Sequence, residues 1–470
     1  MRTVWIVIAI FGIRFLAAAW FYPMHDADLA WQTWLGAHIL HDHRIPAHLG
    51  PETFTASGAA WTPQEWLFSI AVALTLPFGR FPLLALAAVF CAALAFYLVA
   101  LRAHRRGASE AAIGLTAICV GFAMLQSFGV RAQIAAWPLL AGLMLLLESE
   151  GNWIWLAVPL TIVWANLHAS VLLAPALAGA WTIGTFAETP RWSPRLARNA
   201  ALTLALAAAT FCTPLLWRLP FYALHLFNSP ITRAIVEWQP ADILDTGFAL
   251  GVLPLVLAAG LFGIAAPRER WRDGMLFAAT LYLAVDAVRN TPIFAIVAAP
   301  MVAARLTAVL PARARVNEML RERGVTVLLW VATAVAVAAI GIRLMQVPRI
   351  TGVPLPAQAV ASAAELPGVR RLYCEDFAWC SLALLRPNLR TFVDGRCDPF
   401  PPRVWHAYLA IAHLRPDWSS LLDRYRVDTV LASARGPLAQ ALASTPSWRV
   451  SYRDARYAVF VRRRDRAAAR

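Results

Sequence analysis

The chain of 470 residues is 60% hydrophobic and only 15% charged, with a mean hydropathy of +0.58. This composition excludes an ordinary soluble domain, in which about half of the residues are apolar. The net charge is +15, but all 42 basic residues are arginines in short clusters between apolar segments, which is typical of membrane topology. We therefore predict a polytopic membrane protein with no nucleic-acid partner, and the absence of lysine from the sequence is typical of a GC-rich bacterial genome.

The apolar segments predict eleven membrane spans, because a helix needs about twenty apolar residues to cross a hydrocarbon core of about 30 Å. No small-residue cleavage site follows the first segment, so we expect it to be a retained span. The segment 66–78 reaches only about 20 Å as a helix, and we expect it to lie at the outer surface. The predicted spans are 3–22, 81–101, 109–127, 131–147, 153–168, 170–187, 198–215, 246–265, 273–288, 290–309 and 324–346.

Arginine-rich loops predict the orientation of these spans. The segments 102–107, 191–198, 268–272 and 313–323 all fall on one side of the membrane. Since arginine is enriched in cytoplasmic loops, we predict a cytoplasmic N-terminus, an external C-terminus and a location in the bacterial inner membrane. The acidic segment 148–152 also falls inside, and the rule on arginines does not explain it.

The predicted fold is an all-α polytopic membrane domain at residues 1–349, with a first outer loop at 23–80, and a small C-terminal α/β domain at 350–470 in the periplasm. The composition becomes that of a globular protein at the start of the second domain. The elements expected there are strands at 390–396 and 427–433, a helix at 437–443 and a hairpin at 448–463 with its turn at 454–456.

Three of the six cysteines lie in the C-terminal domain, which the topology places in an oxidising compartment. We expect one disulfide among Cys374, Cys380 and Cys397. Cys374 with Cys380 is the first choice, and a pairing with Cys397 stays open.

Polar residues that are unusual for a membrane protein gather on the outer side. Ionisable groups at membrane depth are costly unless they pair or line a wet cavity, so this gathering predicts a site that faces the outer leaflet. The residues are Asp26, Asp28, Glu65, Arg131, Gln133, Asn166, His168, Glu237, Arg289 and Asn290.

Several of these residues also have a structural explanation. Arg131 and Arg289 could extend toward lipid headgroups. His168 could bond Asn166 across a helix turn. Glu65 could be an acidic residue at the N-terminus of a helix, where the helix dipole favours a negative charge. The sequence leaves these alternatives open.

Two aspartates, Asp26 and Asp28, precede an amphipathic helix that carries Leu29, Trp31 and Trp34 in its first turns. One aspartate could cap that helix. Because capping needs only one of the two, we expect at least one of them to act in catalysis or to bind a ligand.

The layout of the chain resembles the GT-C superfamily of integral-membrane glycosyltransferases. These enzymes have a cytoplasmic N-terminus, one span, a long outer loop with acidic residues and surface helices, and many end in an extracytoplasmic domain. The resemblance covers nearly the whole chain and is closest to a bacterial subgroup with five short motifs. Here the motifs are Asp26–Leu29, Glu65–Leu67, Arg131–Gln133, Asn166–His168 and Asp394–Arg396.

The resemblance implies that an outer-loop acid is the catalytic base and that the donor is a sugar on a polyprenyl phosphate. Asp28 or Asp26 would be the base, and the same pair could hold a divalent metal ion. Arg131 and Arg289 would hold the departing phosphate, because a guanidinium group can donate two parallel hydrogen bonds to the oxygens of a phosphate. The expected partners are this donor and membrane lipids. The other residues expected to bind substrate are Glu65, Gln133, His168, Glu237 and Arg396.

Two further interpretations stay open. The loop with Asp394, Arg396 and Asp398 is expected to bind donor or acceptor, but its aspartate and arginine could instead form a structural pair that tightens a turn. The whole chain could be a lipid or solute transporter, or an inactive scaffold with the same fold. A transporter is disfavoured because we detect no internal repeat and the polar residues lie on one side.

Overall fold

The computed structural model describes residues 2–21, 28–75, 81–227, 235–264, 270–309 and 355–463. The chain forms two compact units. The first unit comprises residues 1–22 and 80–350, and the second comprises residues 23–79 and 351–470. The first outer loop therefore belongs to the same unit as the C-terminal residues, although most of the helices lie between them in the sequence.

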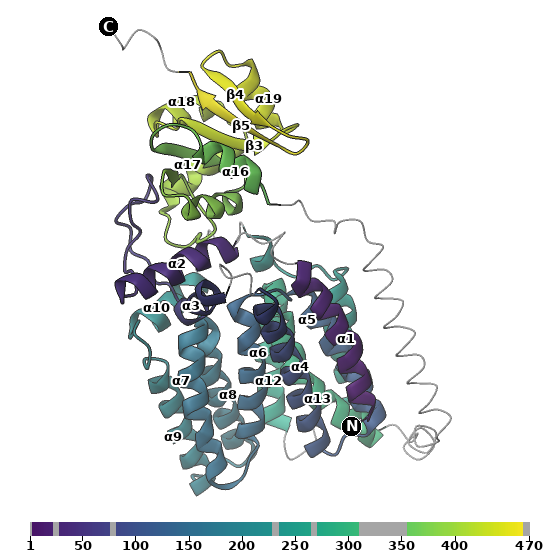
Figure 1. Ribbon diagram of the computed structural model, residues 1–470. Helices are drawn as coiled ribbons and strands as arrows, with labels where there is room; N and C mark the ends of the chain where they lie inside the picture. Colours follow the sequence, from purple (N-terminus) through teal and green to yellow (C-terminus); the bar gives the residue numbers. More distant parts are fainter. Residues whose placement is uncertain are drawn as a thin grey trace. The chain divides into compact units, whose positions relative to one another are not determined.

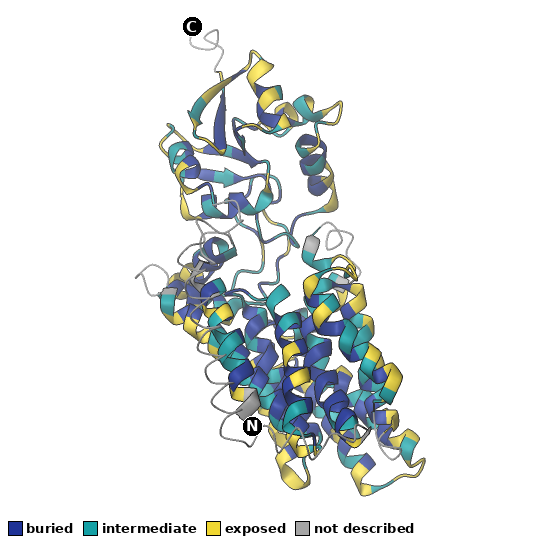
Figure 2. Ribbon diagram, turned by 90° about the vertical axis from the view of Figure 1, so that its right-hand side faces the viewer, coloured by how far each residue is buried: buried dark blue, intermediate teal, exposed yellow. Residues whose placement is uncertain are grey.

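The first unit is a bundle of helices with buried residues in its interior (Figures 1 and 2). Its α-helices are α1 (Arg2–Phe21), α4 (Phe81–Arg105), α5 (Glu110–Gln126), α6 (Ala132–Leu147), α7 (Ala157–Leu167), α8 (Leu173–Glu188), α9 (Pro194–Ala209), α10 (Arg218–Phe227), α11 (Leu253–Phe262), α12 (Arg270–Asp286) and α13 (Thr291–Val309). Short 3₁₀ helices are η3 (Gly151–Leu156), η4 (Ala169–Leu172), η6 (Val236–Trp238) and η8 (Val288–Asn290), and η7 (Phe248–Val252) is a π-helical turn.

Ten of the eleven predicted spans coincide with described helices, and the eleventh, at 324–346, lies outside the described residues. Three described helical segments are long and apolar enough to cross a membrane, namely Pro82–Arg105, Ala169–Glu188 and Val288–Ala308. Shorter apolar helices accompany them. The mostly helical fold is as predicted, while the number of eleven spans stays a prediction.

Charged residues form a network where α4 and α6 end and α12 begins. Glu148 Oε1 accepts hydrogen bonds from Arg102 Nε at 2.7 Å and from Arg106 Nη2 at 2.6 Å. Asp273 Oδ2 accepts from Arg106 Nη1 at 2.7 Å. The Arg102 side chain is only 1% exposed, so its charge requires a paired carboxylate. The acidic loop that the arginine rule leaves unexplained therefore supplies a carboxylate for the buried Arg102 and for the partly buried Arg106.

The second unit contains a five-stranded mixed sheet in the order β2-β1-β3-β5-β4. Strand β1 pairs in parallel with β2 and β3, and β5 pairs antiparallel with β3 and β4. The predicted hairpin is present, whereas the strand predicted at 390–396 ends at Thr391. The strands are β1 (Arg370–Cys374), β2 (Leu389–Thr391), β3 (Thr429–Ser433), β4 (Trp448–Arg453) and β5 (Tyr457–Arg462). The helices are α2 (Asp28–Asp42), α3 (Trp66–Thr75), α16 (Ala357–Ala364), η9 (Phe377–Leu385), α17 (Pro402–Ala412), α18 (Trp418–Arg424) and α19 (Pro437–Ser444).

The outer loop joins the sheet at the edge formed by β2. Thr391 N donates to Glu52 O at 2.8 Å, and Phe54 N donates to Thr391 O at 3.2 Å. The hydroxyl of Thr55 also donates to the Phe392 carbonyl. These backbone bonds extend the sheet by a short segment, which explains why the loop folds with the C-terminal residues.

Helices α2 and α3 of the loop pack closely. A Cβ atom at Gly36 would lie 2.0 Å from the Ser69 carbonyl oxygen, so only glycine permits this approach of the two helices. Leu29, Leu35 and Ile39 on α2 are buried. The helix that carries Asp28 is therefore fixed by packing within the unit.

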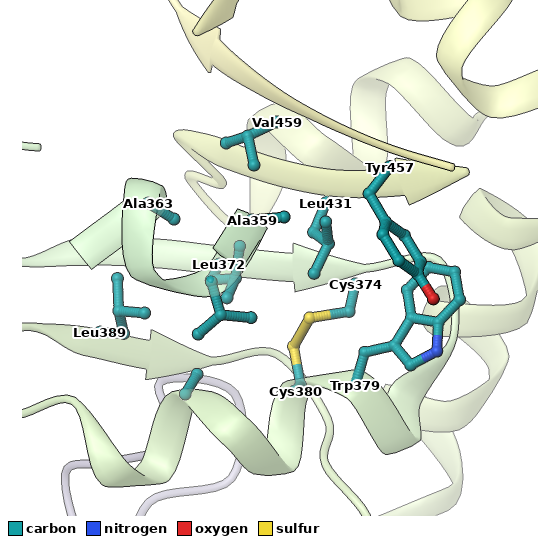
Figure 3. Packing of buried hydrophobic residues seen from close by; sticks show 12 residues of the cluster. Ala359, Ala363, Leu372, Cys374, Trp379, Cys380, Leu389, Leu431, Tyr457 and Val459 are labelled. Carbon is teal, nitrogen blue, oxygen red and sulfur yellow. A yellow bond between two sulfur atoms is a disulfide. The ribbon is translucent and has the colours of Figure 1, made fainter. Parts of the chain in front are cut away.

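The core of the C-terminal residues lies around a disulfide (Figure 3). Cys374 at the end of β1 is bonded to Cys380 in η9, as predicted. Trp379, next to the disulfide, packs edge-on against Tyr457 of β5 with ring centroids 5.1 Å apart. The disulfide thus ties η9 to the central sheet.

Candidate functional site

Four predicted site residues come together in the first unit, at the end where α6 and α13 begin. Arg131 directly precedes α6 and forms an ion pair with Glu237 of η6. Arg289, in the 3₁₀ turn before α13, donates to Gln133 Oε1 at 2.9 Å. The Arg-x-Gln motif is thus in contact with two segments that are distant in the sequence.

Trp238 completes this group. The guanidinium carbon of Arg289 lies 4.4 Å from the centroid of the Trp238 ring, where the aromatic face attracts a cation. The sequence has 20 tryptophans, and in membrane proteins most tryptophans are expected at the interface with water. The sequence alone therefore did not single it out.

The ion pair between Arg131 and Glu237 is accessible to solvent. Burial raises the pKa of Glu237, but the charges of Arg131 and Arg289 lower it more, so the pKa lies below its ordinary value. The side chains of Arg131 and Glu237 are 27% and 40% exposed. Because water screens such a pair, the pair contributes little to the free energy of unfolding.

His168 lies between α7 and η4 and is buried. Its Nδ1 atom accepts from Ser170 N at 3.1 Å and bonds the Ser170 hydroxyl at 2.8 Å. Asn166 donates instead to the carbonyls of Ile162 and Cys212, at 2.8 and 2.9 Å. These bonds of the Asn-x-His motif order the chain between α7 and η4.

Asp28 belongs to the second unit and is the first residue of α2. Its Oδ1 atom accepts a hydrogen bond from Trp31 Nε1 at 3.1 Å. The residue is partly exposed. Asp26, the other aspartate of the motif, lies outside the described residues.

Glu65 holds α2 to the segment that precedes α3. Its Oε2 atom accepts from Gln32 Nε2 at 2.7 Å, and Gln32 is buried. Oε1 accepts from Gln64 Nε2 at 3.0 Å. These bonds connect the Glu-Trp-Leu motif to the helix that begins with Asp28.

Arg396 is enclosed by partners within the second unit. Its Nε and Nη2 atoms donate to the two oxygens of Asp394 at 2.8 and 2.7 Å, and Nη1 donates to Glu52 Oε1 at 2.9 Å. Its guanidinium carbon also lies 5.1 Å from the centroid of the Trp34 ring and 5.0 Å from that of Trp61. The sequence did not identify Glu52, Trp34 or Trp61 as partners of this arginine, because no local pattern marks contacts between distant loops.

Acidic residues surround Cys397, which follows the Asp-Gly-Arg motif. Burial raises the pKa of its thiol, and the negative charges of Asp28, Asp398, Asp394 and Asp376 raise it further. Among the residues that the structure describes, no three His, Cys, Asp or Glu side chains are grouped so that they could hold a metal ion. Asp26 of the predicted metal pair lies outside these residues.

Comparison with known proteins identifies the fold. No family model and no curated protein matches the chain. The oligosaccharyltransferase AglB from Archaeoglobus fulgidus, solved with an inhibitory peptide and a dolichol-phosphate, is similar with a TM-score of 0.60 and 12% identity over 92% of this chain and 69% of that chain. ArnT from Cupriavidus metallidurans, bound to undecaprenyl phosphate, is similar with a TM-score of 0.51 and 15% identity over 97% of both chains. The chain has the GT-C fold.

The apo form of the Archaeoglobus fulgidus oligosaccharyltransferase is similar as well, with a TM-score of 0.63 and 11% identity over 92% of this chain and 69% of that chain. The predicted resemblance to the GT-C superfamily is therefore confirmed at the level of fold. At these identities the likeness carries the fold alone, so the roles of Asp28, Arg131 and Arg289 rest on the chemistry of their surroundings.

Proposed function

We propose that the protein is a membrane glycosyltransferase of the GT-C type, which transfers a sugar from a polyprenyl-phosphate-linked donor to an acceptor. We place the reaction at the outer face of a bacterial cytoplasmic membrane, with the residues after 350 in the periplasm. Two proteins of the same fold support the donor class, since AglB was solved with a dolichol-phosphate and ArnT with undecaprenyl phosphate.

The observation that carries the proposal is the meeting of Arg131 and Arg289 at one end of the helix bundle. The two arginines come from segments before α6 and α13, yet both act on the carboxylate of Glu237. Two guanidinium groups of this kind can bind the oxygens of one phosphate through charge-assisted hydrogen bonds. Gln133 and Trp238 orient the guanidinium group of Arg289, so this group is already positioned before an anion binds.

In the proposed reaction, Asp28 accepts the proton of the acceptor hydroxyl while the acceptor oxygen bonds to the anomeric carbon of the sugar. The bond between that carbon and the phosphate oxygen breaks on the opposite side, which inverts the configuration. The polyprenyl phosphate leaves with the electron pair and one additional negative charge, and the arginines stabilise this charge as it develops. A phosphate is a good leaving group, so no second carboxylic acid is needed, unlike in glycoside hydrolysis.

The remaining predicted residues have supporting roles in this proposal. His168 and Glu65 each order the segments around them within their own unit through the bonds described above, and Glu237 occupies Arg131 until the donor binds. Asp26 orients Asp28 or holds a divalent ion with it. The reaction as written uses only residues of the chain.

The donor class can be tested by mass spectrometry of the lipid that copurifies with the protein. We expect polyprenyl phosphate with the wild-type protein and at least about tenfold less with Arg131→Gln or Arg289→Gln, because each charged hydrogen bond contributes about 1.5–3 kcal/mol. Glu237→Gln should not lower the bound amount, since it removes a competing anion. Arg305→Gln is the matched control, because Arg305 bonds the Phe262 carbonyl elsewhere in the bundle. Binding that is unchanged in both arginine variants would refute the phosphate role.

A further inference from the structure

The turn formed by Asp394, Gly395 and Arg396 lies directly against the start of α2. A Cβ atom added at Gly395 would lie 3.1 Å from Asp28 Oδ1 and 3.3 Å from Trp31 Cδ1. Trp31 is the residue whose indole donates to Asp28. The turn therefore contacts both the carboxylate and the side chain that orients it.

The turn is itself held from the C-terminal core. Gly395 N donates to Ser381 Oγ at 3.0 Å, and a Cβ atom at Gly395 would lie only 2.5 Å from that oxygen. Ser381 follows Cys380, whose disulfide with Cys374 ties η9 to the sheet. A continuous set of contacts thus connects the central sheet to Asp28.

Arg396 connects the same turn to the outer loop at three further points. It donates to Glu52 in the loop, and its planar group lies near the rings of Trp34 and Trp61. Trp34 is on α2, so this contact holds the helix about 1.7 turns beyond Asp28. The Arg396 side chain is fully buried, and Nε and two Nη atoms already donate to carboxylates. This geometry suits a structural arginine and leaves little to offer a substrate.

We infer that the Asp394–Arg396 turn of the C-terminal domain is a positioning element for Asp28, and that Arg396 does not bind donor or acceptor. The inference rests on the proposed function, in which Asp28 is the base. It assigns Glu52, Trp34 and Trp61 as positioning residues as well. The C-terminal domain would then contribute to the rate of the transfer step through the placement of one carboxylate.

Arg396→Lys is the most informative variant. Lysine keeps the positive charge, but its single ammonium group cannot donate two parallel hydrogen bonds to Asp394 and also donate to Glu52. It also has no planar group to lie near the rings of Trp34 and Trp61. We expect kcat to fall about 100-fold, the loss associated with a displacement of about 1 Å in a catalytic group, while KM for the donor stays within about twofold. Hydrogen exchange in peptides from 28–42 should become at least about tenfold faster, with exchange in β3 and β5 unchanged.

Arg462→Lys is the matched control. Arg462 also lies over a tryptophan, with its guanidinium carbon 4.8 Å from the Trp448 ring centroid, and it pairs with Asp423 at 2.5 Å. Arg462 lies in the same domain but on β5, which is separated from β2 by the strands β1 and β3. This variant should leave kcat and exchange in α2 unchanged. If Arg396→Lys fails to fold, Trp61→Leu removes one stacking face, keeps every ion pair and should show the same pattern with a smaller loss of kcat.

The outcomes separate this inference from the proposed function. A raised donor KM with unchanged kcat and unchanged exchange in α2 would make Arg396 a substrate-binding residue and overturn the inference. Folded variants with wild-type kcat and wild-type exchange would overturn it as well. If the wild-type protein transfers no sugar but Arg396→Lys accelerates exchange in α2 alone, the positioning contact stands and the proposed function fails.

Discussion

Replacement of Asp28 by asparagine distinguishes a catalytic base from a structural acid at the start of α2. Asparagine has nearly the same size and keeps an oxygen that can accept from Trp31 Nε1, which lies 3.1 Å from Asp28 Oδ1. A hydrogen bond to a charged group contributes about 1.5–3 kcal/mol, and one between neutral groups about 0.5–1.5 kcal/mol. We therefore expect a loss of about 1 kcal/mol in the free energy of unfolding.

The rate of transfer should respond far more strongly to Asp28→Asn than the stability does. Loss of a general base lowers a rate about 10²- to 10⁴-fold. Since each tenfold change corresponds to about 1.4 kcal/mol, this is about 2.7–5.5 kcal/mol of transition-state stabilisation. If Asp28 were purely structural, Asp28→Asn would lower the free energy of unfolding without lowering the rate of transfer.

The assay is the initial rate of sugar transfer by the protein in liposomes, from a polyprenyl-phosphate-linked donor, together with a thermal unfolding curve. Asp42→Asn is the matched control, because Asp42 lies at the other end of α2 and bonds the exposed ring of His41 at 2.7 Å. It should change neither the rate nor the stability by much. If Asp28→Asn and its double variant with Asp26→Asn both keep near wild-type transfer, Asp28 is not the base.

Three further predictions concern stability. Glu148→Gln leaves the buried Arg102 without its paired carboxylate, while Arg106 keeps Asp273. It should lower the free energy of unfolding by about 3–5 kcal/mol, whereas an unchanged melting temperature would contradict the buried network. Replacing both Cys374 and Cys380 by alanine should cost about 2 kcal/mol, since the disulfide closes a short loop of sequence separation 6, and a reducing agent that leaves the wild-type melting temperature unchanged would argue against it. The pKa of Glu237 lies below its ordinary value of 4.5, so the ion pair with Arg131 stabilises the protein above that pH. This stability is lost as the pH falls through the folded pKa, and the difference between wild type and Glu237→Gln in unfolding experiments should vanish there.

Local sequence patterns predicted much of the fold. The period and length of apolar segments predicted the helices of the bundle, and the amphipathic pattern after Asp28 predicted α2. The alternation of apolar residues predicted the hairpin β4–β5 with its turn at 454–456. Each of these elements depends on neighbours in the sequence, which is why a single sequence is sufficient to predict them.

The partners of the site residues depend on long-range contacts and could not be predicted in the same way. Arg396 bonds Glu52 across 344 positions of sequence, and Arg131 pairs with Glu237 across 106. The sequence did indicate that Arg396 was unusual, through the Asp-Gly-Arg motif. It could not indicate that the first outer loop folds with the C-terminal residues. The sequence around Glu52 and the sequence around Thr391 contain no pattern that predicts the backbone hydrogen bond between these two residues.

The network around Glu148 and the pair of Arg131 with Glu237 differ in exposure, and this difference decides which of the two we assign to a substrate. In the network around Glu148 the side chains of Arg102 and Asp273 are each 1% exposed, so removing a partner from it would cost several kcal/mol. The pair of Arg131 with Glu237 is partly exposed, and such pairs contribute only about 0–1 kcal/mol. We therefore expect that an anionic donor displaces the Glu237 carboxylate from Arg131 with little loss of stability, and that it does not open the network around Glu148. Arg131 and Arg289 are for this reason the cations of the bundle that we assign to the phosphate.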